Sequence, residues 1–270
     1  MPDNRILFVS QEIAPYLPKN EISTLGRELP KAMQAKGYEP RIFMPKYGTV
    51  NERRNQLHEV IRLSGLNIVI DDADHPLILK VASMQPSRIQ VYFVDNDDYF
   101  QKLDEDADPV GSNRDDNDER AIFFARGTME TVKKLRWEPK IIHCSGWMTA
   151  LSPMYLRRMY ADDPSFAGAK IVYSVIPGEI TGKLDPRIFE KLHTDGMNPE
   201  EIKEFTGINP DTSMMHRLAL RYCDAAIFAT DNPDPALVEY ARERNLPMLM
   251  NNEVADNPDA YDNFYKTLTD

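Results

Sequence analysis

Short apolar and β-branched runs alternate with segments of helix length along most of the chain. The first run, Arg5–Ser10, is apolar enough for a buried strand. Apolar residues then recur at helical spacing over Ser23–Lys36, with Ser23 as the expected N-cap and Gly37 at the C-terminal glycine position. A second strand is expected over Arg41–Met44. A strand, a helix and a strand within about 40 residues predict a βαβ unit and therefore a parallel sheet.

The pattern changes after this unit, where strand-like runs follow one another with little helix between them. Four strands are expected: Glu59–Leu63, Leu66–Ile70, Leu77–Ala82 and Ile89–Val94. We interpret them as a small β insertion or an antiparallel edge. Ile89–Val94 is expected to rejoin the main sheet, because its second half is continuously apolar.

The alternation of strands and helices returns after an acidic segment. Helices are expected over Asp116–Arg136, Gly146–Tyr160, Met214–Tyr222, Pro235–Arg244 and Pro258–Thr267, and strands over Lys140–Cys144, Lys170–Val175, Ala225–Ala229 and Pro247–Met250. No internal repeat and no Pro/Gly/Ser-rich linker interrupts the series. The sequence therefore predicts one α/β domain over residues 1–270, built on a Rossmann-like, doubly wound, mostly parallel sheet, with residues 231–270 as a C-terminal helical cover.

Charge and cysteine content narrow the range of functions. The 270 residues include 32 Lys+Arg and 43 Asp+Glu, for a net charge of −11, which argues against binding to nucleic acid or to an anionic membrane. No apolar run approaches the roughly 18 residues that a membrane span requires. The two cysteines, Cys144 and Cys223, exclude a disulfide framework and a cysteine metal site. With no signal-peptide layout at the N-terminus, a cytoplasmic location is expected.

Residues 104–119 contain eight acids and one base. The spacing of Asp104, Asp106, Asp108 and Asp115 is similar to that of a calcium loop. Pro109, however, occupies the place where the tight turn requires glycine, and the flanking helices are missing. A solvated acidic loop is therefore the preferred interpretation, and no metal site is expected.

A possible reactive pair lies where a predicted strand ends, in the segment His143–Trp147. Active sites of parallel sheets lie at the carboxyl ends of strands, and Cys144 beside His143 has the composition of a nucleophile and its base. Adjacent residues of a strand point to opposite faces, however, so a packed histidine and a buried cysteine are favoured.

The segment Pro177–Gly182 follows another predicted strand. Gly178 and Gly182 would allow close approach of a ligand to the backbone, and Glu179 could act as an acid or base, although an ordinary turn has the same composition. The first strand is not followed by a G-x-G-x-x-G motif, and the chain has no phosphate-binding P-loop. No dinucleotide or nucleoside-triphosphate cofactor is therefore expected.

An ordered set of motifs over about residues 5–230 resembles bacterial glycogen synthases and plant starch synthases. The matching segments, in family order, are Ile6–Pro15, Glu28–Ala32, Arg41–Gly48, Val91–Phe100, Asp116–Phe124 and Trp137–Leu151. The resemblance implies the N-terminal half of a two-domain GT-B glycosyltransferase. In that family the N-terminal domain supplies the acceptor face, and the C-terminal domain holds most contacts to ADP-glucose or UDP-glucose. Residues 231–270 are too few for such a donor-binding domain, so none is expected here.

The departures from the family are concentrated where the family performs its chemistry. The K-T-G-G-L loop that meets the donor phosphates is here Pro18–Ile22, with Lys19 one place out of register and Glu21 in place of a glycine. The H-D-W motif is reduced to Trp147, and Ile176 stands where the family keeps a catalytically important histidine.

The candidate site residues follow from the motifs and from these departures. By resemblance and loop composition, the candidates for substrate binding are Lys19, Trp147, Gly178 and Gly182. The remaining candidates for a general acid or base are Glu12, His143 and Glu179.

Three functional hypotheses remain open at this point. The first is a non-catalytic relative of glycogen synthase, a pseudoenzyme that binds a ligand or a partner in glucan metabolism. The second is a transferase completed by a separate donor-domain protein, and the third is a different small-molecule enzyme in the remodelled cleft. A glucan or a nucleotide sugar is the expected ligand. The cleft-facing edge is expected to carry an association surface, for a homodimer or for the separate donor-domain chain.

Overall fold

One mixed sheet runs through the computed structural model, which describes residues 4–101, 103, 107–251 and 257–269. The sheet has ten strands in the order β10-β9-β8-β7-β1-β2-β6-β5-β3, with β4 pairing to β5 off this path. The strands are β1 (Arg5–Ser10), β2 (Glu39–Pro45), β3 (His58–Glu59), β4 (Leu66–Ile70), β5 (Ala73–Met84), β6 (Ile89–Asp95), β7 (Ile141–Ser145), β8 (Lys170–Val175), β9 (Ala225–Phe228) and β10 (Met248–Met250).

The strands from β10 to β6 pair in parallel, and β3, β4 and β5 add antiparallel pairings at one edge. The last strand of the predicted insertion, β6, rejoins the main sheet beside β2, with Ile42 opposite Val91. The predicted fold class, an α/β doubly wound sheet with a small β insertion, is confirmed.

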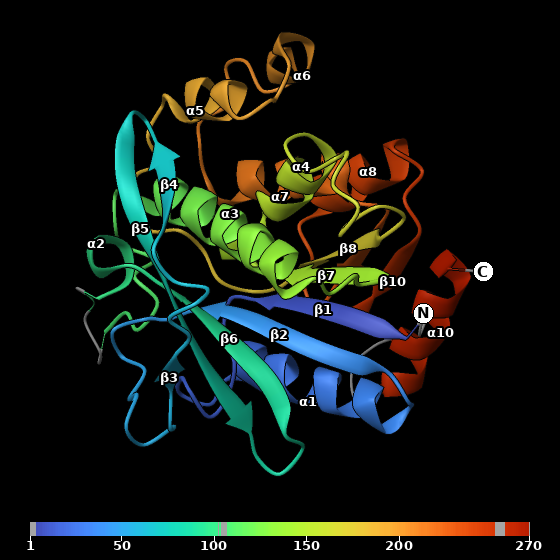
Figure 1. The fold of residues 1–270 in the computed structure, drawn as a ribbon. Helices are drawn as coiled ribbons and strands as arrows, with labels where there is room; N and C mark the ends of the chain where they lie inside the picture. Colours follow the sequence, from blue (N-terminus) through green and yellow to red (C-terminus); the bar gives the residue numbers. More distant parts are fainter. Residues whose placement is uncertain (1–3, 102, 104–106, 252–256, 270) are drawn as a thin grey trace.

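Helices cover both faces of this sheet (Figure 1). One face is covered by α1 (Glu21–Ala35) and α10 (Pro258–Thr269). The other face carries α3 (Asn117–Leu135), α4 (Ser152–Arg157), α7 (Thr212–Tyr222) and α8 (Pro235–Glu243). Three shorter helices, α2 (Asp97–Phe100), α5 (Ile188–Thr194) and α6 (Pro199–Lys203), lie in the connections.

The first helix begins earlier than its sequence pattern predicts. Its N-cap is Asn20, not Ser23, because the Asn20 side chain accepts a hydrogen bond from the Ser23 amide at 2.7 Å. The Ser23 hydroxyl in turn accepts a hydrogen bond from the Asn20 amide at 3.0 Å, which completes a capping box. Gly37 has φ +93°, as expected for the residue that ends a helix.

Three other expectations are corrected. The helix predicted over Gly146–Tyr160 is split into a 3-10 turn, η1 (Trp147–Thr149), and α4, because Pro153 has no amide to continue a helix and instead starts a new one. The strand predicted over Glu59–Leu63 is only the two residues of β3. The helices α5 and α6 were not predicted, because they are short and mostly polar.

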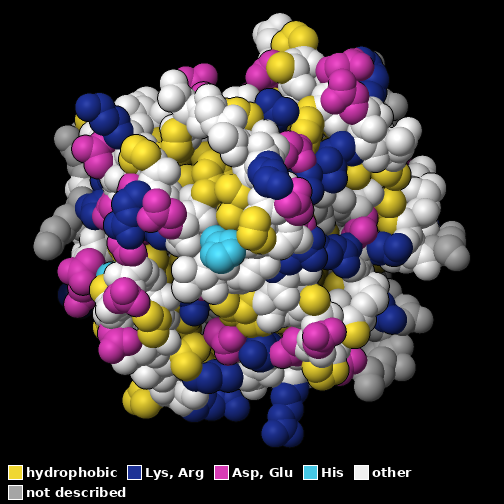
Figure 2. All heavy atoms as spheres, turned by 90° about the horizontal axis from the view of Figure 1, so that it is seen from above, with side chains coloured by type: hydrophobic (Ala, Val, Ile, Leu, Met, Phe, Trp, Pro, Cys, Tyr) yellow, Lys and Arg dark blue, Asp and Glu magenta, His cyan; other side chains and the backbone are white. Residues whose placement is uncertain are grey.

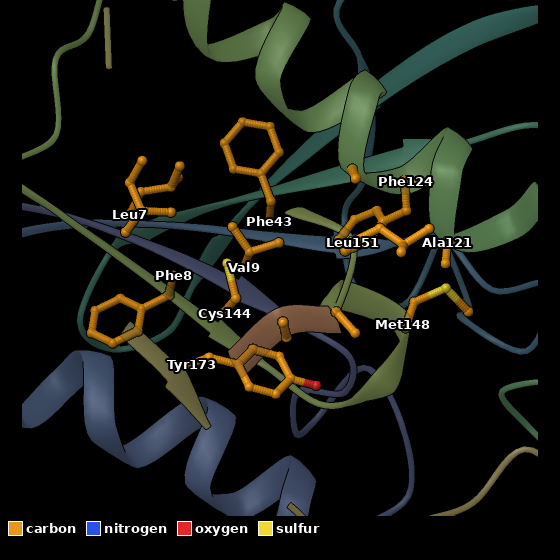
Figure 3. Close-up of a cluster of buried hydrophobic side chains, with 14 of the residues drawn as sticks. Leu7, Phe8, Val9, Phe43, Ala121, Phe124, Cys144, Met148, Leu151 and Tyr173 are labelled. Carbon is orange, nitrogen blue, oxygen red and sulfur yellow. The ribbon is translucent and has the colours of Figure 1, made fainter. Parts of the chain in front are cut away.

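A cluster of buried hydrophobic side chains lies between the sheet and the helices that include α3, as shown in Figure 3. Leu7, Val9, Phe43, Cys144 and Tyr173 point from neighbouring strands toward this side. All five are fully buried. Alternation along each strand sends their neighbours, Phe8 and His143 among them, toward α1 and α10.

Charged side chains of both signs are intermingled on the face seen in Figure 2, which is Figure 1 viewed from above. This face shows no large patch of one sign, as nucleic-acid binding would need. Within the described residues, no helix has both the length and the apolar character needed to cross a membrane.

We expect residues 1–270 to unfold in one cooperative transition, because strands from both ends of the chain lie in the same sheet. Urea unfolding followed by tryptophan fluorescence and by far-UV circular dichroism should give coincident curves. Two separate transitions, with residues 231–270 lost first, would show that the C-terminal cover is an independent unit.

Candidate functional site

A groove of about 900 Å³ lies between α1 and α10, at the carboxyl ends of β8, β9 and β10. Its position follows from the topology: the connections β7–β8, β8–β9 and β9–β10 run over the other face through α4, α7 and α8, so only α1 and α10 cover this face (Figure 1). It is lined by Lys19, Asn20, Glu21, Ile22, Thr24, Leu25, Glu28, Leu29, Lys31, Ala32, Ile176, Pro177, Ala229, Asp231, Asn251, Asn257, Pro258 and Tyr261. Carboxyl ends of parallel strands are where ligands bind in such folds.

The N-terminus of α1 borders the groove but is poorly suited to bind phosphate. Its capping box satisfies the Ser23 amide internally, and Glu21 places a carboxylate in the first turn. The free amides and the positive end of the helix dipole are the features that attract anions. Lys19 is exposed at this end and has no ion-pair partner among the described residues.

Glu12 is buried immediately beneath α1. Its carboxylate accepts hydrogen bonds from Gln11 Nε2 at 3.2 Å and from Asn20 Nδ2 at 2.8 Å. Asn20 therefore joins the Glu12 carboxylate to the cap of α1. No described cation lies within ion-pair distance of Glu12, so this carboxylate is stabilised by neutral amides.

A second, much smaller cavity of about 10 Å³ lies behind the groove. Its polar wall is formed by Ser10, Gln11, Glu12 and Ser145, and its apolar walls include Ile22 and Ile176, which also line the groove. A cavity of this size has room for one water molecule. The buried candidate Glu12 therefore faces a water-sized space rather than a substrate-sized one.

Ile176 lines both cavities and is only 4% exposed. A Cβ atom built on Gly146 would lie 2.9 Å from Ile176 Cδ1 and 2.6 Å from Gln11 Oε1. Any side chain at position 146 would therefore compete with Ile176 and Gln11 for the same space. The two departures from the family pattern at positions 146 and 176 are thus coupled by packing.

Gly146→Ala is expected to destabilise the fold by about 2–4 kcal/mol, because it combines φ +86° with this steric conflict. Gly168→Ala is the matched control, since Gly168 has φ +79° but no atom within 4 Å of the added Cβ. It should cost only the backbone strain, about 1 kcal/mol. Urea unfolding compares the two, and equal losses would contradict the coupling.

His143 is held in a structural position. Its Nδ1 is 2.6 Å from the Tyr265 hydroxyl on α10, and its Nε2 is 2.6 Å from Ser174 Oγ on β8. Burial lowers the pKa of His143 to about 3, and burial raises the pKa of the neighbouring Cys144 thiol. The two side chains point to opposite faces of β7, so they form no nucleophile–base pair.

We expect stability to fall as the pH falls below 6.5, because two buried histidines stay neutral in the folded state. The folded pKa is about 3 for His143 and about 4 for His216, both lowered by burial, against about 6.5 in the unfolded chain. Their stabilising effect is complete above pH 6.5 and is lost toward pH 4, at about 1.4 kcal/mol per pH unit for each histidine. Urea unfolding at pH 7, 6 and 5 measures the slope, which His143→Gln should halve.

The loop Pro177–Gly182 has two different ends. Gly178, with φ +108°, lies near Ile22 and Gln11 and so beside the groove, and Glu179 is exposed to solvent outside it. Gly182 is packed against the backbone of Arg114, and its amide donates a hydrogen bond to the Ser112 carbonyl at 2.9 Å. Close packing against the Arg114 backbone thus explains why position 182 is occupied by glycine.

Trp147 begins η1 and is 1% exposed, so its ring packs in the core and is not available in the groove. Of the four candidates for substrate binding, only Lys19 lines the groove and Gly178 borders it. Glu12 reaches only the small cavity, and His143 and Glu179 reach neither.

The acidic segment is partly outside the described residues, including Asp104 and Asp106. Asp108 accepts hydrogen bonds from the Ser112 hydroxyl and the Asn113 amide, and Asp115 accepts one from the Lys183 amide. Asp108 therefore stabilises its own loop, and Asp115 joins this loop to the one that contains Lys183. In the described part of the chain, no three His, Cys, Asp or Glu side chains gather in an arrangement that could hold a metal ion.

Several residues that line the groove were not predicted from the sequence. Asp231, Asn251 and Tyr261 come from three separate elements, and nothing in their local sequence indicates that they meet. Asn251 Nδ2 donates to Asp231 Oδ1 at 2.5 Å. Tyr261 is 2% exposed, and its hydroxyl has no hydrogen-bond partner among the described residues.

Comparison with known proteins places the chain in a family. Residues 5–230 match the starch synthase catalytic domain model. The glycogen synthase of Chlorobium luteolum is 36% identical over 199 residues, which are 73% of this chain and 40% of that protein. The glycogen synthase of Chlorobaculum parvum is 34% identical over 233 residues, 86% of this chain and 46% of that protein. The chain thus spans less than half the length of these two relatives.

A solved structure supports the same fold. The catalytic domain of starch synthase IV from Arabidopsis thaliana, bound to ADP and acarbose, superposes with a TM-score of 0.70 at 15% identity, over 91% of this chain and 50% of that one. With the family model covering most of the sequence, the predicted resemblance is confirmed: this chain belongs to the starch synthase catalytic domain family.

Proposed function

We propose that this protein is a non-transferring member of its family that binds a ligand or a partner in glucan metabolism. The proposal rests mainly on one observation: the N-terminus of α1, which borders the groove, is poorly suited to bind a phosphate. Its cap is satisfied by Asn20 and Ser23, and Glu21 opposes phosphate. Ile176 filling the space beside Gly146 and the buried, doubly hydrogen-bonded His143 support the same proposal.

A neutral glucan is the favoured ligand over a nucleotide sugar. The groove contains three carboxylates, on Glu21, Glu28 and Asp231, against the two ammonium groups of Lys19 and Lys31. Lys31 is already paired with Glu28 at 2.5 Å. A diphosphate would therefore meet more negative than positive charge, which is unfavourable. Lys19 and the backbone at Gly178 are the proposed contacts of this ligand.

Isothermal titration calorimetry with maltoheptaose and with ADP-glucose tests the proposal. We expect binding of maltoheptaose, weakened by Thr24→Trp, which would fill the groove, and no measurable binding of ADP-glucose. Gln34→Trp, on the exposed face of α1 outside the groove, is the matched control. Submillimolar binding of ADP-glucose to the chain alone would contradict the proposal.

A second candidate function is a glucosyltransferase completed by a separate chain. The short coverage of the relatives, 40% and 46% of their lengths, favours it, because those proteins contain a second half that this sequence does not match. Transfer activity that appears only when a purified donor-domain protein is added would support this candidate.

A further inference from the structure

We propose that the groove between α1 and α10 is a docking site for an amphipathic α-helix of a partner protein, with basic residues along the flank of that helix. This inference concerns a protein partner and does not depend on whether the chain binds glucan or transfers glucose.

The spacing of apolar residues on α1 is the first reason. Ile22, Leu25, Leu29 and Ala32 all line the groove, and their separations of three, four and three residues form one stripe along the helix. Three of them, Ile22, Leu25 and Ala32, are only partly buried. A 3-4-3 stripe is the pattern with which one helix packs against another. The eleven residues from Ile22 to Ala32 span about 15 Å, the length of a helix of about ten residues.

The opposite wall makes the stripe one side of a groove rather than a free helix surface. Ile176 and Pro177 follow β8, Ala229 follows β9, and Pro258 and Tyr261 belong to α10. Side chains on the apolar face of a bound helix would therefore contact the stripe of α1 on one side and these residues on the other. This is the helix-in-groove mode of recognition.

The position of α10 is fixed independently of any partner. Lys36, just beyond α1, pairs with Asp259 and Asp262, and the Tyr38 hydroxyl donates to Asp262 at 2.8 Å. Tyr265 contacts the buried His143. The two walls are therefore preformed, which lowers the cost of binding.

The charge around the groove indicates which charge a bound partner helix should carry. Glu21 and Asp231 have no ion-pair partner among the described residues, and the whole chain carries −11. Lys31 is engaged by Glu28, which leaves Lys19 at one end as the exposed cation. Lysine or arginine on the flanks of a bound helix would be attracted by these carboxylates.

The apolar part of the walls favours aliphatic side chains over a flat aromatic ligand. The apolar lining residues are aliphatic apart from Tyr261, which is 2% exposed and offers no ring for stacking. Aliphatic side chains of a helix match such walls better than a ring system that needs a flat aromatic partner.

Fluorescence anisotropy with synthetic peptides tests the proposal. The probe is a labelled 14-residue peptide with leucine at 3-4 spacing and lysine at the flanking positions. A peptide of the same composition with permuted order, and one with glutamate in place of lysine, are the references. We expect the first peptide to bind at least tenfold more tightly than either reference, with an affinity that falls as salt is raised.

Two charge-matched variants of the full chain locate the site. Ala32→Arg places a cation inside the groove and should weaken binding of the leucine–lysine peptide at least tenfold. Ala35→Arg adds the same charge to an exposed position of α1 outside the groove and should leave binding within twofold. Circular dichroism and melting temperature show that both variants are folded.

Three results would overturn the assignment: equal binding of the permuted peptide, equal loss in the two arginine variants, or a dimer in sedimentation that Ala32→Arg dissociates. The last result would assign the groove to a second copy of this chain. None of these measurements uses a nucleotide sugar or a glucan, so the docking proposal can fail while the proposed function stands, and the reverse.

Discussion

The purified 270-residue chain is expected to transfer no glucose from ADP-glucose or UDP-glucose to maltoheptaose or glycogen. Transfer requires the anomeric carbon and the acceptor hydroxyl to be held together in attack geometry. Positioning of this kind contributes about 7–11 kcal/mol, or roughly 10⁵–10⁸ in rate. The α1 end is capped and acidic, and this sequence matches less than half the length of the glycogen synthases of Chlorobium luteolum and Chlorobaculum parvum.

The candidate groups near the groove cannot supply this contribution. Glu12 is sequestered by Gln11 and Asn20 and reaches only a water-sized cavity. His143 has both ring nitrogens engaged, and its lowered pKa keeps it neutral at pH 7. We therefore expect neither group to stabilise the negative charge that develops on a pyrophosphate in the transition state.

A radiolabelled donor assay on the purified chain measures the effect. Ile176→His places a histidine at the position where the sequence resemblance expects one, and we expect this variant to remain inactive because Glu21 and the capped end of α1 still disfavour a donor phosphate. Clear turnover by the unmodified chain, abolished by Lys19→Ala or by Glu12→Ala, would overturn the non-transferring assignment.

The central strands could be predicted from the sequence, because strands buried on both faces are continuously apolar. The β1 and β8 strands, which lie inside the sheet, begin and end at the predicted residues, and so does β4 at the edge, where buried and exposed residues alternate. The helix predicted over Gly146–Tyr160 is interrupted in the structure because of one residue, Pro153. The start of α1 depended on the side chain of Asn20, because either Asn20 or Ser23 can cap a helix and only the tertiary structure distinguishes them.

The groove could be predicted only in part. The loop containing Lys19 and the substitution at Ile176 were visible as departures from a family pattern. Their packing connection was not visible, because it depends on Ile176 Cδ1 lying 2.9 Å from the place of an added Cβ on Gly146, which is 30 positions away in the sequence. Asp231, Asn251 and Tyr261 come together through the order of β8, β9 and β10, which local patterns do not determine.

The helices α5 and α6 were missed for a different physical reason. Each offers only a short apolar pattern, such as the buried pair Ile188 and Leu192 on α5, and each is also held by polar partners distant in the sequence. Arg187 pairs with Asp71 at 2.8 Å, Arg158 pairs with Glu201, and Asp195 accepts a hydrogen bond from Tyr155 at 2.5 Å. Ion pairs of this kind leave no periodic pattern in a single sequence.

Lys191, on α5, pairs with three carboxylates, and replacing it should have a large effect on stability. Lys191 Nζ lies 2.8 Å from Asp118, 2.7 Å from Glu119 and 2.9 Å from Asp185. Asp118 is 1% exposed. Lys191 contacts its Oδ2, and its Oδ1 has no hydrogen-bond partner among the described residues. Burial raises the pKa of Asp118 even beside this lysine.

Lys191→Met is therefore expected to destabilise the fold by about 3–5 kcal/mol at pH 7.5, because it leaves a buried carboxylate without its cation. Lys203→Met is the matched control: Lys203 pairs with Glu200 at 2.6 Å on the surface, with 69% of its side chain exposed, and should cost less than about 0.5 kcal/mol. Urea unfolding measures both variants.

The pH dependence separates charge from packing in this prediction. Without Lys191 the pKa of Asp118 must rise further, because the lysine is what favours its ionised form. A carboxyl group with a raised folded pKa weakens the fold by a constant amount above that folded pKa, and the weakening disappears as the pH falls from the folded pKa toward the unfolded pKa. The loss in Lys191→Met should therefore shrink between pH 7.5 and pH 5. A loss that stays constant across this range would assign the role of Lys191 to packing of its aliphatic chain against α3.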